Sequence, residues 1–578
     1  ERFQADTVLQ AAWQAVQAAQ SAYNHAEEAK RAQAEARLAQ ARQAWYARLR
    51  EVFPEFFDLP PFDQIACAAG DAPLVYLLAT PAGGLALIVS VGAGLAPAPG
   101  ATARGATARV APTVRAVWLD ELTEKALNER LVKTDKTGEN VTGGYLPAQL
   151  AVAGWMSDAL ADLLPWLGKT VMGPVAQALR DQTFGVSETP KVFPVTLIPA
   201  GRLALLPLHA ARYRRDGREV HFLDEFAVAY APSALTLRTA RRRLAERPPA
   251  ARRLVGVGNP LPPVEALGDL HRALREAVAA LPDEEATAPL RSELARLVAR
   301  PTGELRHEGF LLRQLVLRLP ERLAGAGAHG RASLQELVQR WPLSLRYAKA
   351  ELQSVVDLLP PGAADPLYEQ EATRAALLPH LAGADLLHFS CHGSFDPEEP
   401  LDSALHLVGD ERLSLREMLD PDFPGLAAVR LATLSACQTA IGDYRNLPEE
   451  AIGLPAGLLQ AGAPAVIGTL WSVDDASTAL LMTRAYERML QEGEPPLFAL
   501  RRAQTWLRDL TNAELEAYLA HHEAIAEARR QGAQRMPFAL LEELLIQVIT
   551  AQDPAARPYA DPYFWAPFAF YGVEEMPV

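Results

Sequence analysis

The sequence predicts an α/β protein with a mainly parallel β-sheet that is covered by helices on both faces. Short apolar runs of strand length recur along the chain, and amphipathic segments of helical length separate most of them. Most of these runs are continuously apolar, which is typical of strands buried on both faces of a parallel sheet. In such sheets the crossovers are right-handed and ligands bind beyond the carboxyl ends of the strands.

The length of 578 residues exceeds one ordinary domain, so we expect several units. Segment 1–53 has neither Gly nor Pro, is rich in Ala and predicts a long helix or a helical hairpin. A first α/β unit is expected over 60–247 and a second over 252–578. Stretches of about 261–345 and 511–560 interrupt the second unit, and we interpret them as helical insertions with a regulatory or substrate-docking role.

Composition excludes several classes of protein. A net charge of −14 argues against nucleic-acid binding, which needs a concentrated basic surface. The three cysteines, Cys67, Cys391 and Cys437, form neither a disulfide framework nor a zinc-binding pattern. We therefore expect a cytoplasmic protein with no metal and no other cofactor.

An uncharged stretch over 72–103 is long enough to cross a bilayer. The breakers "TPAGGL" and "APAPG" divide it, however, and separate "LVYLLA" from "LALIVSV". We interpret these two apolar runs as the strands of a buried hairpin, and expect no membrane span.

Two reactive side chains follow neighbouring strands of the second unit. His392 follows the apolar run "LLHFSC", and Cys437 ends the next parallel run, "RLATLSA". Because consecutive parallel strands are usually neighbours about 4.8 Å apart, we expect the two side chains to meet above the carboxyl edge of the sheet.

Two nearby residues are poorer candidates for this chemistry. Successive side chains of a strand point to opposite faces, so Cys391 should point away from His392 and pack in the core. His388 lies in the middle of its strand, and we expect a buried histidine with satisfied hydrogen bonds or a hairpin contact.

A Cys/His pair is sufficient for acyl transfer, because the histidine activates the thiol as a nucleophile. Gly393 leaves room for a substrate carbonyl to approach the backbone. The amide N–H groups of Gly393 and Cys437 are then the candidates for an oxyanion hole. Small-residue turns occur in any α/β sheet, so the spacing by itself leaves a purely structural reading open.

The motifs "HFSCHGSFD", "TLSACQTAIGD", "GLPAGLLQAGAPAVIGTLWSVDDASTALLM" and "DPYFWAPFAFYG" together resemble the CHAT family of caspase-like cysteine proteases, which includes relatives of separase. The resemblance extends over roughly 60–578. It implies a caspase-like three-layer fold with His392 as general base, Cys437 as nucleophile, and Gly393 with Cys437 as oxyanion donors. It also implies that unit 60–247 is a degenerate caspase-like domain.

The resemblance also bears on partners and on the residue before the scissile bond, P1. In this family, a helical segment such as 1–53 commonly continues a tetratricopeptide-repeat sensor array, which implies a sensor or activating protein partner. Ser435 and Thr439 depart from the caspase signature Q-A-C-[RQG]-G, so a preference for aspartate is not carried over. Asp474 and Asp475 in "LWSVDD" are S1-pocket candidates for a basic P1 residue, because separases have a similar "LWDVTD" run and carboxylates pair with guanidinium groups.

Alternatives remain open for the aspartates and for the whole protein. Asp474 and Asp475 are equally well placed to cap the following helix. The chain is predicted to be a regulated cysteine endopeptidase that cuts a protein substrate, and the alternative is a catalytically silent caspase-like scaffold. A nucleotide-binding enzyme is disfavoured because no GxGxxG or GxxxxGK[ST] motif opens a helix after a strand.

Overall fold

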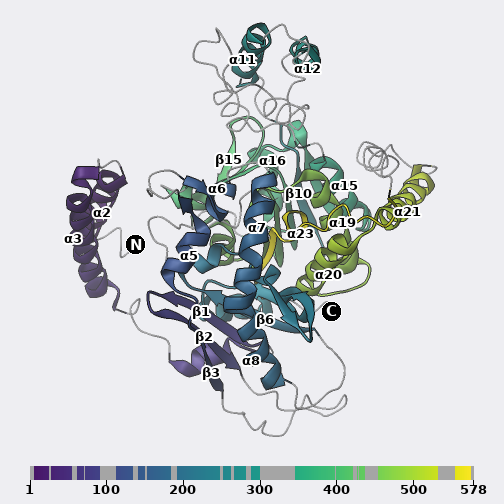
Figure 1. The fold of residues 1–578 in the computed structure, drawn as a ribbon. Coiled ribbons are helices and arrows are strands. Elements are labelled where there is room, and N and C mark those ends of the chain that lie inside the picture. Colours follow the sequence, from purple (N-terminus) through teal and green to yellow (C-terminus); the bar gives the residue numbers. More distant parts are fainter. Residues whose placement is uncertain are drawn as a thin grey trace. The chain divides into compact units, whose positions relative to one another are not determined.

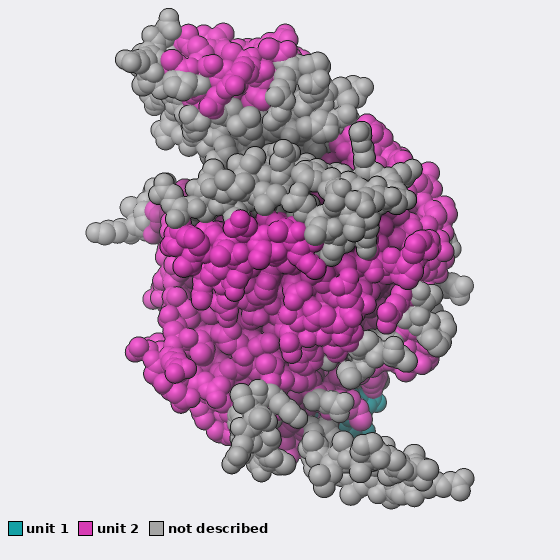
Figure 2. Space-filling view, turned by 90° about the vertical axis from the view of Figure 1, so that its right-hand side faces the viewer, with its two compact units in different colours: residues 1–65 teal, residues 66–578 magenta. Residues whose placement is uncertain are grey.

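The structure is a computed structural model, and it divides the chain into two compact units, residues 1–65 and 66–578 (Figure 2). The residues described are 6–24, 28–54, 61–70, 72–90, 112–134, 141–149, 153–183, 192–247, 252–261, 266–281, 288–299, 345, 347–396, 399–420, 423, 426, 428–436, 453–530 and 553–573.

The first unit contains two packed helices, α2 (Thr7–Asn24) and α3 (Glu28–Val52). Leu9 and Val16, which stand seven residues apart in α2, are buried. At one end of the pair, a carboxylate oxygen of Asp6 accepts a hydrogen bond from the backbone of Leu9 (2.8 Å), and Asp6 also pairs with Arg48 of α3 (2.5 Å). Asp6 thus links the start of α2 to the last turns of α3.

The second unit is built on an eleven-stranded sheet among its described residues. The strands across the sheet are, in order, β11 (Ala364–Tyr368), β10 (Leu254–Gly258), β12 (Leu386–Ser390), β16 (Leu431–Ser435), β17 (Ala465–Thr469), β18 (Phe568–Gly572), β9 (Phe226–Tyr230), β6 (Phe193–Pro199), β1 (Leu74–Thr80), β2 (Gly83–Ser90) and β3 (Thr113–Leu119). Only the β17–β18, β1–β2 and β2–β3 pairs are antiparallel. The predicted α/β class with a mainly parallel sheet is confirmed.

Helices cover both faces of this sheet. Leu254 of β10 packs with Leu352 and Tyr486, whereas the next residue, Val255, belongs to a cluster with Leu377 and Leu458. Adjacent strand residues point to opposite faces, so the two helix pairs lie on opposite sides. The first pair is α15 (Ala348–Asp357) and α19 (Asp475–Leu490), which lie side by side in Figure 1, and the second is α16 (Arg374–Leu381) and α18 (Leu454–Ala461).

Shorter strands and further helices complete the described part of this unit. The short strands are β4 (Lys133–Thr134), β5 (Val141–Gly143), β7 (Arg212–Arg215), β8 (Arg218–His221), β13 (Gly393–Ser394), β14 (Ala404–His406) and β15 (Arg412–Ser414). The further helices are α4 (Phe62–Cys67), α5 (Glu124–Leu131), α6 (Tyr145–Gln149), α7 (Ala153–Leu167), α8 (Gly173–Thr183), α9 (Phe222–Glu225), α10 (Ala234–Ala245), α11 (Ala266–Ala280), α12 (Ala288–Val298), α17 (Leu415–Met418), α20 (Pro496–Asp509), α21 (Asn512–Arg530) and α23 (Pro562–Trp565).

The two predicted α/β units contribute to one continuous sheet. The C-terminal strand β18 lies between β17 of the second predicted unit and β9 of the first. Buried His209 adds a side-chain link, because its ring bonds both Tyr230 of β9 (2.8 Å) and the backbone carbonyl of Ala566 (3.1 Å). The division into a degenerate and a catalytic domain stays a prediction.

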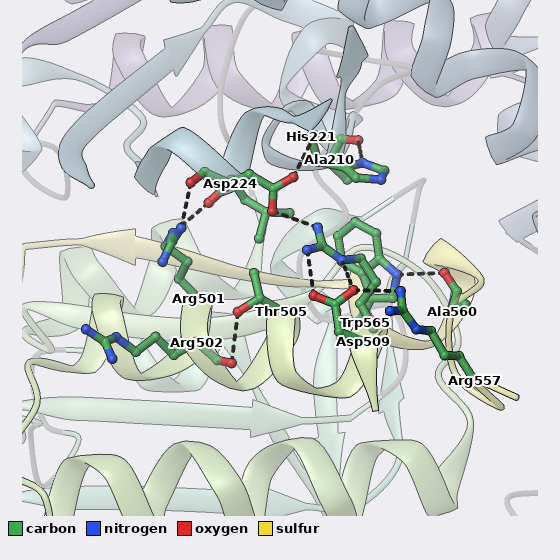
Figure 3. A network of polar contacts seen from close by, with 12 residues as sticks. Ala210, His221, Asp224, Arg501, Arg502, Thr505, Asp509, Arg557, Ala560 and Trp565 are labelled. Carbon is green, nitrogen blue, oxygen red and sulfur yellow. Dashed lines mark hydrogen bonds and ion pairs between the residues drawn. The ribbon is translucent and has the colours of Figure 1, made fainter. Parts of the chain in front are cut away.

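A polar network joins α20 to α9 (Figure 3). Arg501 donates hydrogen bonds to the backbone carbonyls of Leu223 (2.6 Å) and Asp224 (2.8 Å). Further along the same helix, Arg508 pairs with the Asp224 carboxylate (2.8 Å) and lies over the ring of Trp565. The network therefore connects helix α20, the short helix α9 and the segment that leads into β18.

The uncharged N-terminal stretch forms the predicted hairpin as far as the structure describes it. Strands β1 and β2 pair antiparallel with Leu74 opposite Val89, and both strands have buried residues. Within the described ranges, no helix is both long and apolar enough to cross a bilayer.

Candidate active site

Strands β12 and β16 run side by side and place matching residues on the same face. His388 is opposite Thr433, and Ser390 is opposite Ser435. Since the side chains on one face of a strand recur every second residue, these pairs form successive steps of one row. His392 follows two residues after Ser390, beyond the end of β12.

The exit of β12 is held by backbone hydrogen bonds on two sides. Asn259, which follows β10 in a left-handed conformation (φ 53°), donates its N–H to the carbonyl of Ser390 (2.9 Å). On the other side, the N–H of His406 in β14 donates to the carbonyl of His392 (2.9 Å). These bonds fix the turn that carries His392 at the carboxyl edge of the sheet. The side chain of His392 is partly exposed.

The exit of β16 is described as far as Ala436, and Cys437 lies outside the described residues. Ala436 is buried, and its carbonyl accepts a hydrogen bond from the hydroxyl of Thr469 at the end of β17 (2.5 Å). The residue before Cys437 is thereby tied to the next strand. Neighbouring strands thus fix the backbone at His392 and at Ala436, the residue before Cys437.

The amide of Gly393 lies on the outer side of the small sheet β13–β14–β15. Gly393 is opposite Leu405, and the hydrogen bond from His406 to His392 makes this a non-hydrogen-bonded pair. Its N–H is therefore directed away from β14, which is the orientation that an oxyanion donor needs. Cys437, the second predicted donor, lies outside the described residues.

Both candidate S1 aspartates are half-buried and take part in local hydrogen bonds. Asp474 is the N-cap of α19, and its side chain accepts from the N–H of Ser477 (2.9 Å). This confirms the capping interpretation for Asp474. Asp475, in the first turn of α19, accepts from the N–H of Tyr347 (3.0 Å). Their role in substrate binding stays a prediction.

The interpretations of Cys391 and His388 are confirmed. Cys391 is 1% exposed and belongs to the apolar cluster that contains Phe389 on the face opposite the row. His388 is completely buried and is hydrogen-bonded through both ring nitrogens, to Tyr486 (3.2 Å) and to Glu351 (2.9 Å). Both residues thus have the structural roles that the sequence predicted for them.

Comparison with known proteins adds the family. The family model described as the CHAT domain matches residues 161–573, which is most of the chain. The chain belongs to the CHAT domain family. The predicted resemblance is therefore confirmed, and the matched range includes His392, Gly393, Cys437, Asp474 and Asp475.

Solved structures that resemble this CHAT protein do so at low identity. The separase–securin complex of Saccharomyces cerevisiae matches with 12% identity and a TM-score of 0.31, over 78% of this chain and 22% of the separase-complex chain. The complex of the pro- and mature domains of RgpB from Porphyromonas gingivalis matches with 9% identity and a TM-score of 0.33, over 71% of each chain. No curated protein matches the sequence significantly.

The structure brings to the CHAT site several residues that the sequence reasoning did not single out. Glu351 of α15 and Tyr486 of α19 hydrogen-bond to the ring of His388, and Tyr486 also donates to Thr433 of β16. Their partners are far apart in the sequence. The one available signal in the sequence was Glu351, an acidic residue on a largely apolar helix face, and the sequence does not indicate which residue it contacts.

The hairpin beside His392 carries a second histidine whose charge state is fixed by burial. The ring of His406 lies 3.0 Å from the hydroxyl of Ser394, and burial lowers its pKa from 6.5 to about 4. His406 is therefore neutral near pH 7. In the described parts of the chain, no three His, Cys, Asp or Glu side chains are grouped so as to hold a metal ion.

Proposed function

We propose that this CHAT protein is a cysteine endopeptidase in which His392 is the general base and Cys437 the nucleophile. The supporting observation is the register of β12 and β16. The pairs His388/Thr433 and Ser390/Ser435 share one face. Two further residues of extended chain on each strand would put His392 and Cys437 on that same face. Strand spacing of about 4.8 Å is compatible with a hydrogen-bonded Cys/His pair.

The chemistry of such a dyad follows from its groups. The His392 imidazole takes the proton of the Cys437 thiol, and the thiolate attacks the carbonyl carbon of the scissile peptide. The developing oxyanion is met by the amide of Gly393, which faces away from β14, and by the amide of Cys437. His392 then protonates the leaving amine, and later deprotonates the water that hydrolyses the thioester.

An active-site-directed probe tests the dyad directly. A panel of peptidyl acyloxymethyl ketones with different P1 residues, followed by peptide mass spectrometry, should give a thioether on Cys437 and none on Cys67 or Cys391. Labelling should be lost when the His392→Ala variant or the denatured chain is used. Equal labelling of native and denatured protein would contradict an activated thiol and favour the scaffold alternative.

The proposed S1 pocket uses Asp474 and Asp475 to select a basic P1 residue. Both carboxylates lie at the start of α19, after β17, the strand next to the β16 strand that leads to Cys437. A partly buried carboxylate at this position pairs favourably with a guanidinium or ammonium group. The proposal is therefore a preference for Arg or Lys at P1.

Conservative substitutions separate the charge of these aspartates from their structural hydrogen bonds. In Asp474→Asn the side-chain oxygen still caps α19, and in Asp475→Asn an oxygen remains to accept from Tyr347. If the charge selects P1, these variants should lose about ten-fold or more in kcat/KM for P1 Arg peptides relative to P1 Leu peptides. An unchanged P1 profile in both variants would remove the S1 role.

Control by a sensor or activating partner is proposed for the N-terminal helices. Trp13, Trp45 and Tyr46 form an aromatic cluster with 5.0 Å between neighbouring ring centroids, and Trp13 and Tyr46 are each 37% exposed. Exposed aromatic rings are frequent anchors of protein interfaces. In the full chain, Trp13→Ala with Tyr46→Ala should abolish any stimulation of peptide cleavage by cell extract while basal cleavage persists. Equal stimulation would contradict this contact.

A further inference from the structure

We propose that Glu351 and Tyr486 are positioning residues that fix the two strand exits on which the dyad stands. The inference rests on the proposed function. It concerns a buried polar network on the face that β12 and β16 share, two to four residues before His392 and Cys437 in the sequence.

The centre of the network is a buried carboxylate on α15. Glu351 has no exposed surface, yet both of its oxygens are used. One lies 2.9 Å from Nε2 of His388, and the other accepts from the hydroxyl of Ser390 (3.0 Å). A buried carboxyl group is tolerated where its oxygens are hydrogen-bonded, so Glu351 specifies where the side chains of His388 and Ser390, neighbours on one face of β12, must lie.

Tyr486 carries the connection from β12 across to β16. Its hydroxyl lies 3.2 Å from Nδ1 of His388 and donates a hydrogen bond to the hydroxyl of Thr433 (2.9 Å). His388 and Thr433 are opposite each other in the register, so one oxygen atom links the two strands on their shared face. The strands that lead to His392 and Cys437 are thus joined by side chains as well as by their backbone ladder.

The residues just before α15 form hydrogen bonds with residues that follow β10 and β17. The N–H of Leu345 donates to the side chain of Asn259 (2.8 Å), whose own N–H holds the carbonyl of Ser390. The N–H of Tyr347 donates to Asp475 at the start of α19 (3.0 Å). Together with Glu351, these bonds connect α15 to the exits of β10, β12 and β17.

The network lies close enough to the predicted dyad residues in the sequence to affect their alignment. His392 and Cys437 each follow the Ser390/Ser435 pair by two residues, and two residues of extended chain span about 7 Å. A Cys/His pair must be aligned to within a fraction of an ångström, and small misplacements reduce the chemical step while leaving substrate binding largely intact. Loss of the cross-strand link should therefore lower kcat more than it raises KM.

The sharpest variant removes one atom. Tyr486→Phe keeps the ring and deletes the bridging oxygen, and Thr433→Val deletes the acceptor hydroxyl at nearly constant volume, while Thr433→Ser keeps it. We expect kcat to fall about ten-fold in the Phe and Val variants with KM within two-fold, and recovery in the Ser variant. The control is Tyr230→Phe in β9, which deletes another buried hydroxyl, the one that bonds to His209.

A second readout separates this inference from the proposed function. The rate at which iodoacetamide alkylates Cys437 in native protein is followed by mass spectrometry, whether or not any peptide is cleaved. We expect Tyr486→Phe and Thr433→Val to change this rate several-fold, and Tyr230→Phe and Thr433→Ser to leave it unchanged. If the wild type cleaves nothing, the proposed function fails. If the alkylation rates and kcat of Tyr486→Phe and Thr433→Val equal those of the wild type, the positioning role is overturned.

Discussion

Acid should destabilise this CHAT protein through His209, which is buried where the two halves of the sheet meet. A backbone carbonyl can only accept, so Nε2–H of His209 donates to Ala566 (3.1 Å) and Nδ1 faces the hydroxyl of Tyr230 (2.8 Å). This arrangement suits the neutral ring. Burial lowers the pKa of His209 from 6.5 to about 4, so the folded protein resists the proton that the unfolded chain binds readily.

The sign and size of the effect follow from proton linkage. Between pH 6.5 and 4 the unfolded chain binds more protons at this residue than the folded protein, so stability is complete above pH 6.5 and is lost as the pH falls. With folded and unfolded pKa values of about 4 and 6.5, lowering the pH from 7 to 5 removes about 2 kcal/mol of the free energy of unfolding.

Comparison with His209→Gln isolates this one residue, because an amide can donate to Ala566 and face Tyr230 without titrating. Urea unfolding of both proteins at pH 7 and pH 5 gives the difference in their free energies of unfolding. That difference should shift by about 2 kcal/mol in favour of the variant at pH 5, while contributions from other histidines cancel. A difference that does not depend on pH would refute the reasoning.

Three further substitutions test packing and the assignment of the cysteines. Gly168→Ala should destabilise the fold by about 3 kcal/mol or more, because an added Cβ would lie 1.8 Å from the backbone oxygen of Arg212. Gly383→Ala, where a Cβ meets nothing within 4 Å, should shift the thermal midpoint little, and equal midpoints for the two variants would contradict this packing. Cys391→Ala should cost about 1–2 kcal/mol of stability but leave kcat unchanged, and a loss of cleavage by folded protein would contradict its packing role.

The elements around the site were predictable because their signals are local. Apolar runs of strand length ended where β10, β12, β16 and β17 end, within a few residues, and small residues marked each turn. Once parallel order was assumed, the adjacency of β12 and β16 followed from their succession in the chain. The opposite orientations of His388 and Cys391 then followed from the two-residue period of a strand.

The polar network was not predictable because its members are remote in sequence. Glu351 is 37 residues from His388, and Tyr486 is 53 residues from Thr433. The placement of β18 between β17 and β9 is equally non-local, since the strand returns from the C-terminus to the middle of the sheet. Such pairings depend on the packing of whole layers, which local periodicity does not report.

The most direct test of the central claim is peptide cleavage by the wild type, Cys437→Ala and His392→Ala, with P1 scanned in a pooled fluorogenic set. We predict cleavage by the wild type alone, strongest after Arg or Lys. If Cys437→Ala cleaves peptides at the wild-type rate, Cys437 is not the nucleophile and the proposed mechanism is wrong.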